Sequence, residues 1–262
     1  MYKSLFLGLV QGLTEFLPVS SSGHLAIFQN ILALELESSL PYELVLHIAT
    51  ALATLIFFRK DIIEILSGWF RGLKHKELRT SDPWRLGSCV LIGTVLTGVI
   101  GLSTKNIVEA ISQEVAMVGI FLCVTGAILL ATKFAETRKR KISYSNSAII
   151  GLVQGIATLP GISRSGSTIA TAIFLGTDKE EAFKFSFLLS IPAICGACLL
   201  EFCDLGTEGF MLALPDGWLL GAVIAFVVGY LSLALLKKLV IEAKWHYFGV
   251  YCFIIGIIAI VY

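Results

Sequence analysis

The chain has 262 residues, of which 56% are hydrophobic and 15% are charged, and its mean hydropathy is +0.85. Soluble domains are typically about half apolar and about a quarter charged, so this composition excludes an ordinary soluble domain and indicates an integral membrane protein. The formal net charge of +1 gives no sign of a nucleic-acid-binding surface. We therefore expect an all-α membrane protein that is surrounded by membrane lipids and has no nucleic-acid partner.

Six long apolar stretches have lengths that suit membrane-spanning helices. A span needs about 20 residues, within a range of roughly 17–25, and these stretches lie at the short end of that range. The segment DIIEILSGWFRGLKHKE, between the first and second stretches, combines aromatic and basic residues as an interfacial helix does. In chain order, the predicted spans cover about residues 42–58, 86–102, 115–132, 185–203, 218–236 and 247–262.

Two further apolar segments, 5–34 and 147–176, are interrupted in the middle. Each contains the sequence GLVQG, followed by a proline and then by a cluster of serine and glycine. Proline cannot donate the hydrogen bond that an unbroken helix needs, and irregular backbone at membrane depth occurs only where protein or a wet cavity covers it. We therefore predict two re-entrant helical hairpins. The first segment also resembles a secretory signal peptide, but Glu15 interrupts it and its internal copy favours the hairpin.

Lys and Arg residues are concentrated in alternate connecting segments. Such an excess marks the cytoplasmic side of a membrane protein, so we expect both chain termini to face outside and the two hairpins to enter from opposite sides. Fifteen of these residues lie in 59–85, 133–146 and 237–246, whereas 35–41, 103–114 and 204–217 contain only Lys105.

This arrangement predicts an inverted-topology repeat in which each half is a re-entrant hairpin followed by three transmembrane helices. The first repeat covers residues 1–132, a basic cytoplasmic linker covers 133–146, and the second repeat covers 147–262. Inverted repeats bring their broken helices together near the membrane midplane and form a site between them.

The polar side chains of the two hairpins suit a phosphate site. Serine–glycine turns that open onto helices present free N–H groups and the positive end of the helix dipole, and an arginine fork matches phosphate oxygens in pairs. A carboxylate, an imidazole and a hydroxyl are the groups that hydrolysis uses. Alternatively, the serines only cap helices and fill tight contacts. The residues concerned are Glu15, Ser20, Ser21, Ser22, His24, Ser163, Arg164, Ser165 and Thr168.

His47 lies alone in an apolar predicted span. Because histidines in such positions usually pack in the core, we interpret His47 as a core residue without a chemical role.

Two motifs carry a family resemblance. The segments QGLTEFLPVSSSGH and LPGISRSGST, together with FSFLLSIP further on, closely resemble signature sequences of the undecaprenyl-diphosphate phosphatase family, also called the bacitracin-resistance family. The resemblance extends along nearly the whole chain. It implies an enzyme of the bacterial plasma membrane that hydrolyses undecaprenyl diphosphate to undecaprenyl phosphate and inorganic phosphate, and so recycles the lipid carrier for peptidoglycan and cell-wall synthesis.

The resemblance also assigns roles to individual residues. It implies catalytic roles for Glu15, Ser21, His24 and Arg164, and phosphate binding by Gln11, Ser20, Ser22, Ser163, Ser165, Gly166 and Thr168. It further implies a divalent cation, Mg²⁺ or Ca²⁺, with Glu15 as a ligand, a site that opens to the outer face, and a homodimer. Gln11 stands where the doubly acidic version of the family motif has a second carboxylate, so the sequence leaves a single carboxylate for the cation.

Two questions stay open at the level of sequence. The nucleophile is Ser21, His24 or a water molecule, and the residues do not decide among them. A lipid-phosphate transporter is the competing function, because carriers also bind their substrates between broken helices of inverted repeats. A carrier needs positive groups for phosphate but no acid–base pair, so Glu15 with His24 favours the phosphatase.

Overall fold

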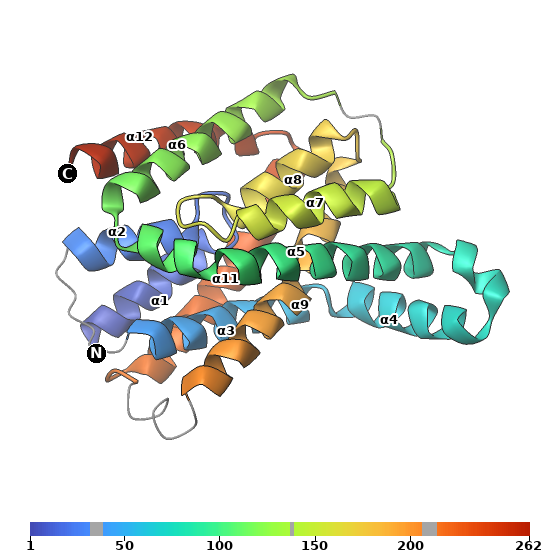
Figure 1. Cartoon of the computed structure of the whole chain (residues 1–262), viewed down its shortest axis with the longest axis horizontal. Coiled ribbons are helices and arrows are strands. Elements are labelled where there is room, and N and C mark those ends of the chain that lie inside the picture. The colour runs from blue at the N-terminus through green and yellow to red at the C-terminus, as the bar shows by residue number, and fades with distance from the viewer. Residues whose placement is uncertain (32–38, 137–138, 206–213) are drawn as a thin grey trace.

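The computed structural model describes residues 1–31, 39–136, 139–205 and 214–262, and within these ranges it contains helices and no β-strand. The predicted all-α class is confirmed (Figure 1). In chain order the helices are α1 (Tyr2–Thr14), α2 (Ser21–Ile31), α3 (Ser39–Phe57), α4 (Arg59–Lys74), η1 (Lys76–Thr80), α5 (Asp82–Ser112), α6 (Val115–Ala131), η2 (Thr132–Phe134), α7 (Tyr144–Ile156), α8 (Arg164–Phe174), α9 (Lys179–Leu205), α11 (Trp218–Ile241), η3 (Trp245–Tyr247) and α12 (Phe248–Val261).

Four of the described helices are long and apolar enough to cross a bilayer, namely α5, α6, α9 and α11. A fifth candidate is the pair α3 and α4, which is bent by 75° at the junction. The last apolar segment, Trp245–Val261, is shorter and packs along α6. These helices identify the chain as an integral membrane protein.

Helix α5 is longer than the sequence predicted. We expected a span over 86–102 and a loop over 103–114, but α5 continues through Ser112 and only two residues separate it from α6. The segment 103–112 contains no proline or glycine, and residues such as Lys105, Glu109 and Ala110 favour the helical conformation. The predicted loop is therefore wrong, because nothing in this segment ends the helix.

The two ends of the helical bundle differ in character. Both chain termini lie at one end, and the tip formed by α4, η1 and the start of α5 lies at the other (Figure 1). The basic segment 59–85 is therefore at the end opposite to the termini. Ion pairs near this end join α9 to its neighbours: Arg85 to Glu181 at 2.9 Å and Lys237 to Glu180 at 3.2 Å.

Both predicted helix breaks are present, and they contact each other. Residues 15–20 separate α1 from α2, and residues 157–163 separate α7 from α8. Each break contains one residue in the left-handed conformation, Ser20 at a φ of 67° and Gly161 at a φ of 95°. The N–H of Gly161 donates to Oγ of Ser20 at 3.1 Å. The two breaks therefore meet inside the bundle.

The repeated GLVQG sequence forms two equivalent helix contacts. Gly8 of α1 faces Gly221 of α11, and Gly151 of α7 faces Gly93 of α5. A Cβ atom on Gly8 would lie 2.9 Å from the carbonyl carbon of Gly221, and one on Gly151 would lie 2.6 Å from Cα of Gly93. Glycine at such positions lets membrane helices approach backbone to backbone, so the repeated glycines fix how the first helix of each hairpin packs.

We expect Gly151→Ala to destabilise the protein, because the added methyl group would force α7 away from α5 and overpacking of this kind costs about 1–3 kcal/mol. Thermal unfolding in detergent measures the effect as a lower melting temperature. Gly98→Ala, also on α5, is the matched control, because a Cβ at Gly98 meets no atom within 4 Å. Equal melting temperatures for the two variants would contradict the close contact.

Candidate active site

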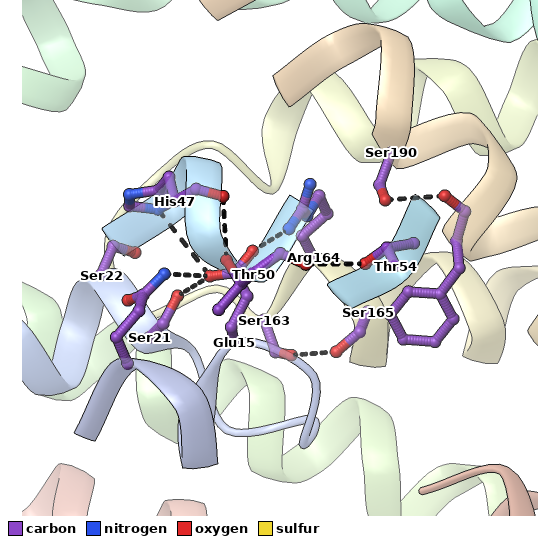
Figure 2. A network of polar contacts seen from close by, with 12 residues as sticks. Glu15, Ser21, Ser22, His47, Thr50, Thr54, Ser163, Arg164, Ser165 and Ser190 are labelled. Carbon is purple, nitrogen blue, oxygen red and sulfur yellow. Dashed lines mark hydrogen bonds and ion pairs between the residues drawn. The ribbon is translucent and has the colours of Figure 1, made fainter. Parts of the chain in front are cut away.

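Glu15 is the centre of a cluster of polar side chains between the two hairpins (Figure 2). Glu15 is 6% exposed and directly follows α1. One carboxylate oxygen, Oε1, forms an ion pair with Arg164, the first residue of α8. The other, Oε2, accepts hydrogen bonds from Oγ of Ser21 at 2.6 Å and from Nε2 of Gln11 at 3.0 Å. Nε2 of His47 lies 3.8 Å from the same oxygen.

All of these side chains except Gln11 line a cavity of about 230 Å³. The cavity receives residues from both hairpins and from α3, α5 and α9, so it lies where the two halves of the chain meet. Its lining consists of Glu15, Ser20, Ser21, Ser22, His47, Thr97, Gln154, Ala157, Thr158, Ile162, Ser163, Arg164, Ala193, Ile194 and Ala197. A larger cavity of about 350 Å³ is lined mainly by charged side chains near the basic end and contains none of the predicted site residues.

Two helix N-termini border this cavity. Ser21 is the first residue of α2 and Arg164 is the first residue of α8, and both line the cavity. The first N–H groups of a helix have no acceptor within the helix, and they carry part of the positive end of the helix dipole. Together with the guanidinium of Arg164, they form a region that favours a phosphate group.

Several of the predicted phosphate-binding hydroxyls instead hold the hairpins together. Oγ of Ser20 accepts the N–H of Gly161 and also that of Gly23 at 3.3 Å, and Oγ of Ser163 accepts the N–H of Gly166 at 3.1 Å as the N-cap of α8. Thr168 and Ser165 form further contacts. Thr168 Oγ1 donates to the carbonyl oxygen of Arg164 at 2.8 Å and lies 2.5 Å from Ser186 Oγ, and Ser165 Oγ lies 3.3 Å from Ser163 Oγ.

The structure brings only some of the predicted site residues together. Gln11, Glu15, Ser21 and Arg164 come together as one hydrogen-bonded group, and Ser20, Ser22 and Ser163 line the cavity beside them. Five predicted residues are not part of the cavity lining, namely Gln11, His24, Ser165, Gly166 and Thr168.

His24 lies apart from the carboxylate and arginine. Its ring is stacked on Tyr251 of α12, with 5.6 Å between the ring centroids, and the residue is 3% exposed. Nδ1 lies 2.8 Å from the carbonyl oxygen of Ser20, and Nε2 lies 2.8 Å from the hydroxyl of Tyr251. Because a carbonyl oxygen can only accept, Nδ1 carries the proton and Nε2 accepts from Tyr251. Both ring nitrogens are therefore engaged by Ser20 and Tyr251, and His24 does not line the cavity.

His47 is the imidazole that the cavity contains, and its interpretation as a core residue is wrong. Its side chain is 31% exposed, and its Nδ1 lies 2.9 Å from the carbonyl oxygen of Glu43, which directs Nε2 towards Glu15. The sequence does carry a signal for this position. Polar residues recur along one face of α3 at helical spacing, as Glu43, His47, Thr50 and Thr54, and a polar stripe of this kind in an apolar helix indicates a face that meets a polar site.

Glu15 and Gln11 are the residues that fit a divalent cation. The described residues contain no group of three or more His, Cys, Asp or Glu side chains suited to hold a metal. However, Oε1 of Gln11 is buried next to Glu15 and has no hydrogen-bond partner among the described residues. Mg²⁺ typically binds through one or two carboxylates together with substrate phosphates. One carboxylate, one free amide oxygen and a diphosphate therefore match this kind of site.

Comparison with known proteins identifies the family of the chain. A family model described as "Bacitracin resistance protein BacA" matches residues 4–258. The chain belongs to this family.

Relatives of the chain carry the name "Undecaprenyl-diphosphatase". A protein of Desulfosudis oleivorans is 42% identical over 97% of this chain and 95% of its own length. A protein of Methanococcus vannielii is 40% identical over 99% of both chains. A protein of Methanosphaera stadtmanae is 38% identical over 99% of this chain and 96% of its own length. The similarity therefore covers both hairpins and all the helices between them.

We expect Ser20→Ala to lower the stability of the protein, because it leaves the buried N–H of Gly161 without an acceptor, which costs about 1–3 kcal/mol. The measurement is thermal unfolding in detergent. Ser22→Ala serves as the control, since the Ser22 hydroxyl forms only a 3.4 Å contact with Ser20. If both variants have the melting temperature of the wild type, the Ser20 hydroxyl does not stabilise the contact between the hairpins.

Proposed function

We propose that the protein is an integral membrane hydrolase that converts undecaprenyl diphosphate to undecaprenyl phosphate and inorganic phosphate. The observation that carries this proposal is the Glu15 cluster, in which a buried carboxylate contacts both a hydroxyl and a guanidinium beside two helix N-termini. Membership of the BacA family and the names of the relatives support the same activity. The reaction regenerates the lipid carrier for cell-wall synthesis, which agrees with the family's link to bacitracin resistance.

In the mechanism that we propose, Ser21 is the nucleophile. Its hydroxyl already donates to Glu15 at 2.6 Å, which is the arrangement of a nucleophile with its base. Arg164 and the N-termini of α2 and α8 bind the terminal phosphate and offset the negative charge that accumulates there. Oγ of Ser21 attacks the terminal phosphorus, its proton passes to Glu15, and the bridging P–O bond breaks so that undecaprenyl phosphate leaves. Water then hydrolyses the phosphoserine.

His24 and His47 have different roles in this mechanism. His24 supports the start of α2 through Ser20 and Tyr251, so it positions Ser21 without contacting the substrate. His47 lies beside Glu15 within the cavity and is close enough to contact a bound diphosphate.

A divalent cation is part of the proposal. Glu15 and the free oxygen of Gln11 would hold it together with the diphosphate. The cation, Mg²⁺ or Ca²⁺, would neutralise phosphate charge and polarise the terminal phosphoryl group. Because Gln11 stands in place of a second carboxylate, the negative charge of Glu15 would be the main attraction for the ion.

We further propose that the chain is an inverted repeat, with residues 1–132 and 147–262 as its halves and 133–146 as the cytoplasmic linker. The symmetric packing of the two halves supports the inverted repeat. Helix α1 of the first half packs on α11 of the second, and α7 of the second half packs on α5 of the first. The positive-inside rule then places both termini outside the plasma membrane. The homodimer and the opening of the site to the outer face stay predictions from the family resemblance.

Lipid-phosphate transport is the less favoured function. A carrier would need Arg164 and the helix N-termini, but it has no use for a serine hydroxyl that donates to a buried carboxylate. Release of inorganic phosphate by the purified protein in detergent, from undecaprenyl diphosphate, is the experiment that separates the two functions. A protein that binds this lipid without releasing phosphate would contradict the phosphatase.

We expect Arg164→Ala to lose at least about 30-fold in activity, because truncating one partner of a buried charge pair costs about 2–5 kcal/mol. Arg164→Lys should recover only part of this loss, since an ammonium group cannot form the paired contact of a guanidinium. The phosphate-release assay measures both variants, and size-exclusion chromatography shows that they remain folded. Near-normal activity in a folded Arg164→Ala variant would remove Arg164 from the site.

The topology can be tested with reporter proteins fused after Tyr262 and within the linker after Lys141. We expect alkaline phosphatase, which is active only outside the cytoplasm, to be active at Tyr262 and inactive at Lys141, and a green fluorescent reporter to show the reverse. The predicted outer loop 204–217 lies largely outside the described residues, so these two positions carry the test. A cytoplasmic C-terminus would refute the inverted repeat.

A further inference from the structure

Gln154 of α7 carries a buried oxygen that accepts no hydrogen bond from any described residue. The residue is 1% exposed, and its Oε1 has no hydrogen-bond partner within the described ranges. Other buried side-chain atoms there also lack partners, but of the residues that carry them only Gln154 lines the 230 Å³ cavity. A buried acceptor without a partner costs about 1–3 kcal/mol. A hydrogen-bond donor from outside the chain, such as a water molecule, would remove this cost.

The orientation of the Gln154 amide is fixed by its other contacts. Its Nε2 lies 3.3 Å from the carbonyl oxygen of Leu189, which can only accept, so this group is the NH₂ and not the oxygen. The same Nε2 donates to Oγ1 of Thr97 at 3.2 Å, and the proton of Thr97 is used by the carbonyl oxygens of Gly93 and Gly151. Oε1 is therefore an acceptor held in place by two contacts.

On the α7 side of the cavity Gln154 and Thr158 present acceptors, whereas the donors that suit phosphate are Arg164 and the N-termini of α2 and α8. Thr158, which follows α7 and also lines the cavity, donates its hydroxyl proton to the carbonyl oxygen of Gly155 at 2.8 Å. Its oxygen lone pairs remain available to accept. Two acceptors repel phosphate oxygens but suit a molecule with two hydrogens, and a bound water typically makes about three hydrogen bonds to polar groups.

We propose that Gln154 and Thr158 bind the water molecule that hydrolyses the phosphoserine, which rests on the proposed phosphatase mechanism. The water donates to Oε1 of Gln154 and to Oγ1 of Thr158, so that its oxygen lone pair faces the cavity. That oxygen bonds to phosphorus, and the bond from phosphorus to Oγ of Ser21 breaks with its electron pair on Oγ. Glu15 returns its proton to Oγ. One water proton stays on the released phosphate, and the other leaves to solvent.

The test separates the two halves of the reaction. Purified protein is mixed rapidly with undecaprenyl diphosphate labelled on its terminal phosphate, and undecaprenyl phosphate, free phosphate and protein-bound label are followed. For Gln154→Leu we expect formation of about one equivalent of undecaprenyl phosphate at a rate within about twofold of wild type, since Gln154 acts only after this step. Phosphate release should be about 10- to 100-fold slower, with label accumulating on Ser21, because a misplaced reactant typically costs about 10²-fold.

Matched variants show whether the effect comes from the acceptor or from packing. Ser147→Ala removes a buried hydrogen bond of 2.5 Å between the same two helices, α7 and α5, without reaching the cavity, so it should react like the wild type. Gln154→Glu keeps an acceptor oxygen and should recover most of the phosphate release. Thr158→Val removes the second acceptor at an exposed position, and should slow the same step even if Gln154→Leu fails to fold.

The inference is overturned if Gln154→Leu and Thr158→Val slow the formation of undecaprenyl phosphate and the release of free phosphate equally, or if neither variant slows phosphate release. It is also overturned if the wild type releases phosphate while Ser21→Ala does so at the same rate, because no phosphoserine would then need water. Failure of the proposed function has a different signature, since a wild-type protein that is not a phosphatase would form neither product.

Discussion

The ion pair between Glu15 and Arg164 is the contact on which the arrangement of the site depends. The two residues are 149 positions apart in the sequence; Glu15 begins the break of the first hairpin, and Arg164 directly follows the break of the second. A charged side chain at the centre of a membrane helix costs about 2.5–3.5 kcal/mol on insertion scales. Each hairpin can therefore carry its charge inside the protein only when the other hairpin is in place, and the pair that stabilises them also forms the reactive cluster.

The same two breaks create backbone groups that would be unpaired in lipid, and serine and threonine side chains satisfy them. Ser20 accepts the N–H of Gly161, while Thr125 of α6 donates to the carbonyl oxygen of Gly161 at 2.8 Å and accepts the N–H of Ser163 at 3.0 Å. Most of the conspicuous hydroxyls thus maintain the breaks. This division of roles leaves Ser21 free to donate to Glu15.

The sequence predicted that Glu15, Ser21 and Arg164 belong to one site, and the structure brings them together, but His47 lines the cavity in place of the predicted His24. His24 is close to Ser21 along the chain, yet its ring stacks on Tyr251 of α12 and forms a hydrogen bond with the hydroxyl of Tyr251. His47 belongs to another helix, and only the packing of α3 against the first hairpin brings it to Glu15. Nearness along the chain therefore did not predict nearness in space.

The sequence by itself determined the membrane environment, the positions of most spans, the two breaks and the residue types at the breaks. These properties follow from local composition, from prolines that end helices and from the length needed to cross a bilayer. Only the tertiary structure decided which polar groups share the cavity and why GLVQG occurs twice, with Gly8 on Gly221 and Gly151 on Gly93. Such contacts join helices that are distant in the chain, and they depend on which helix faces meet. The hydropathy of the sequence shows how apolar a face is but not which partner it packs against, so it does not predict these contacts.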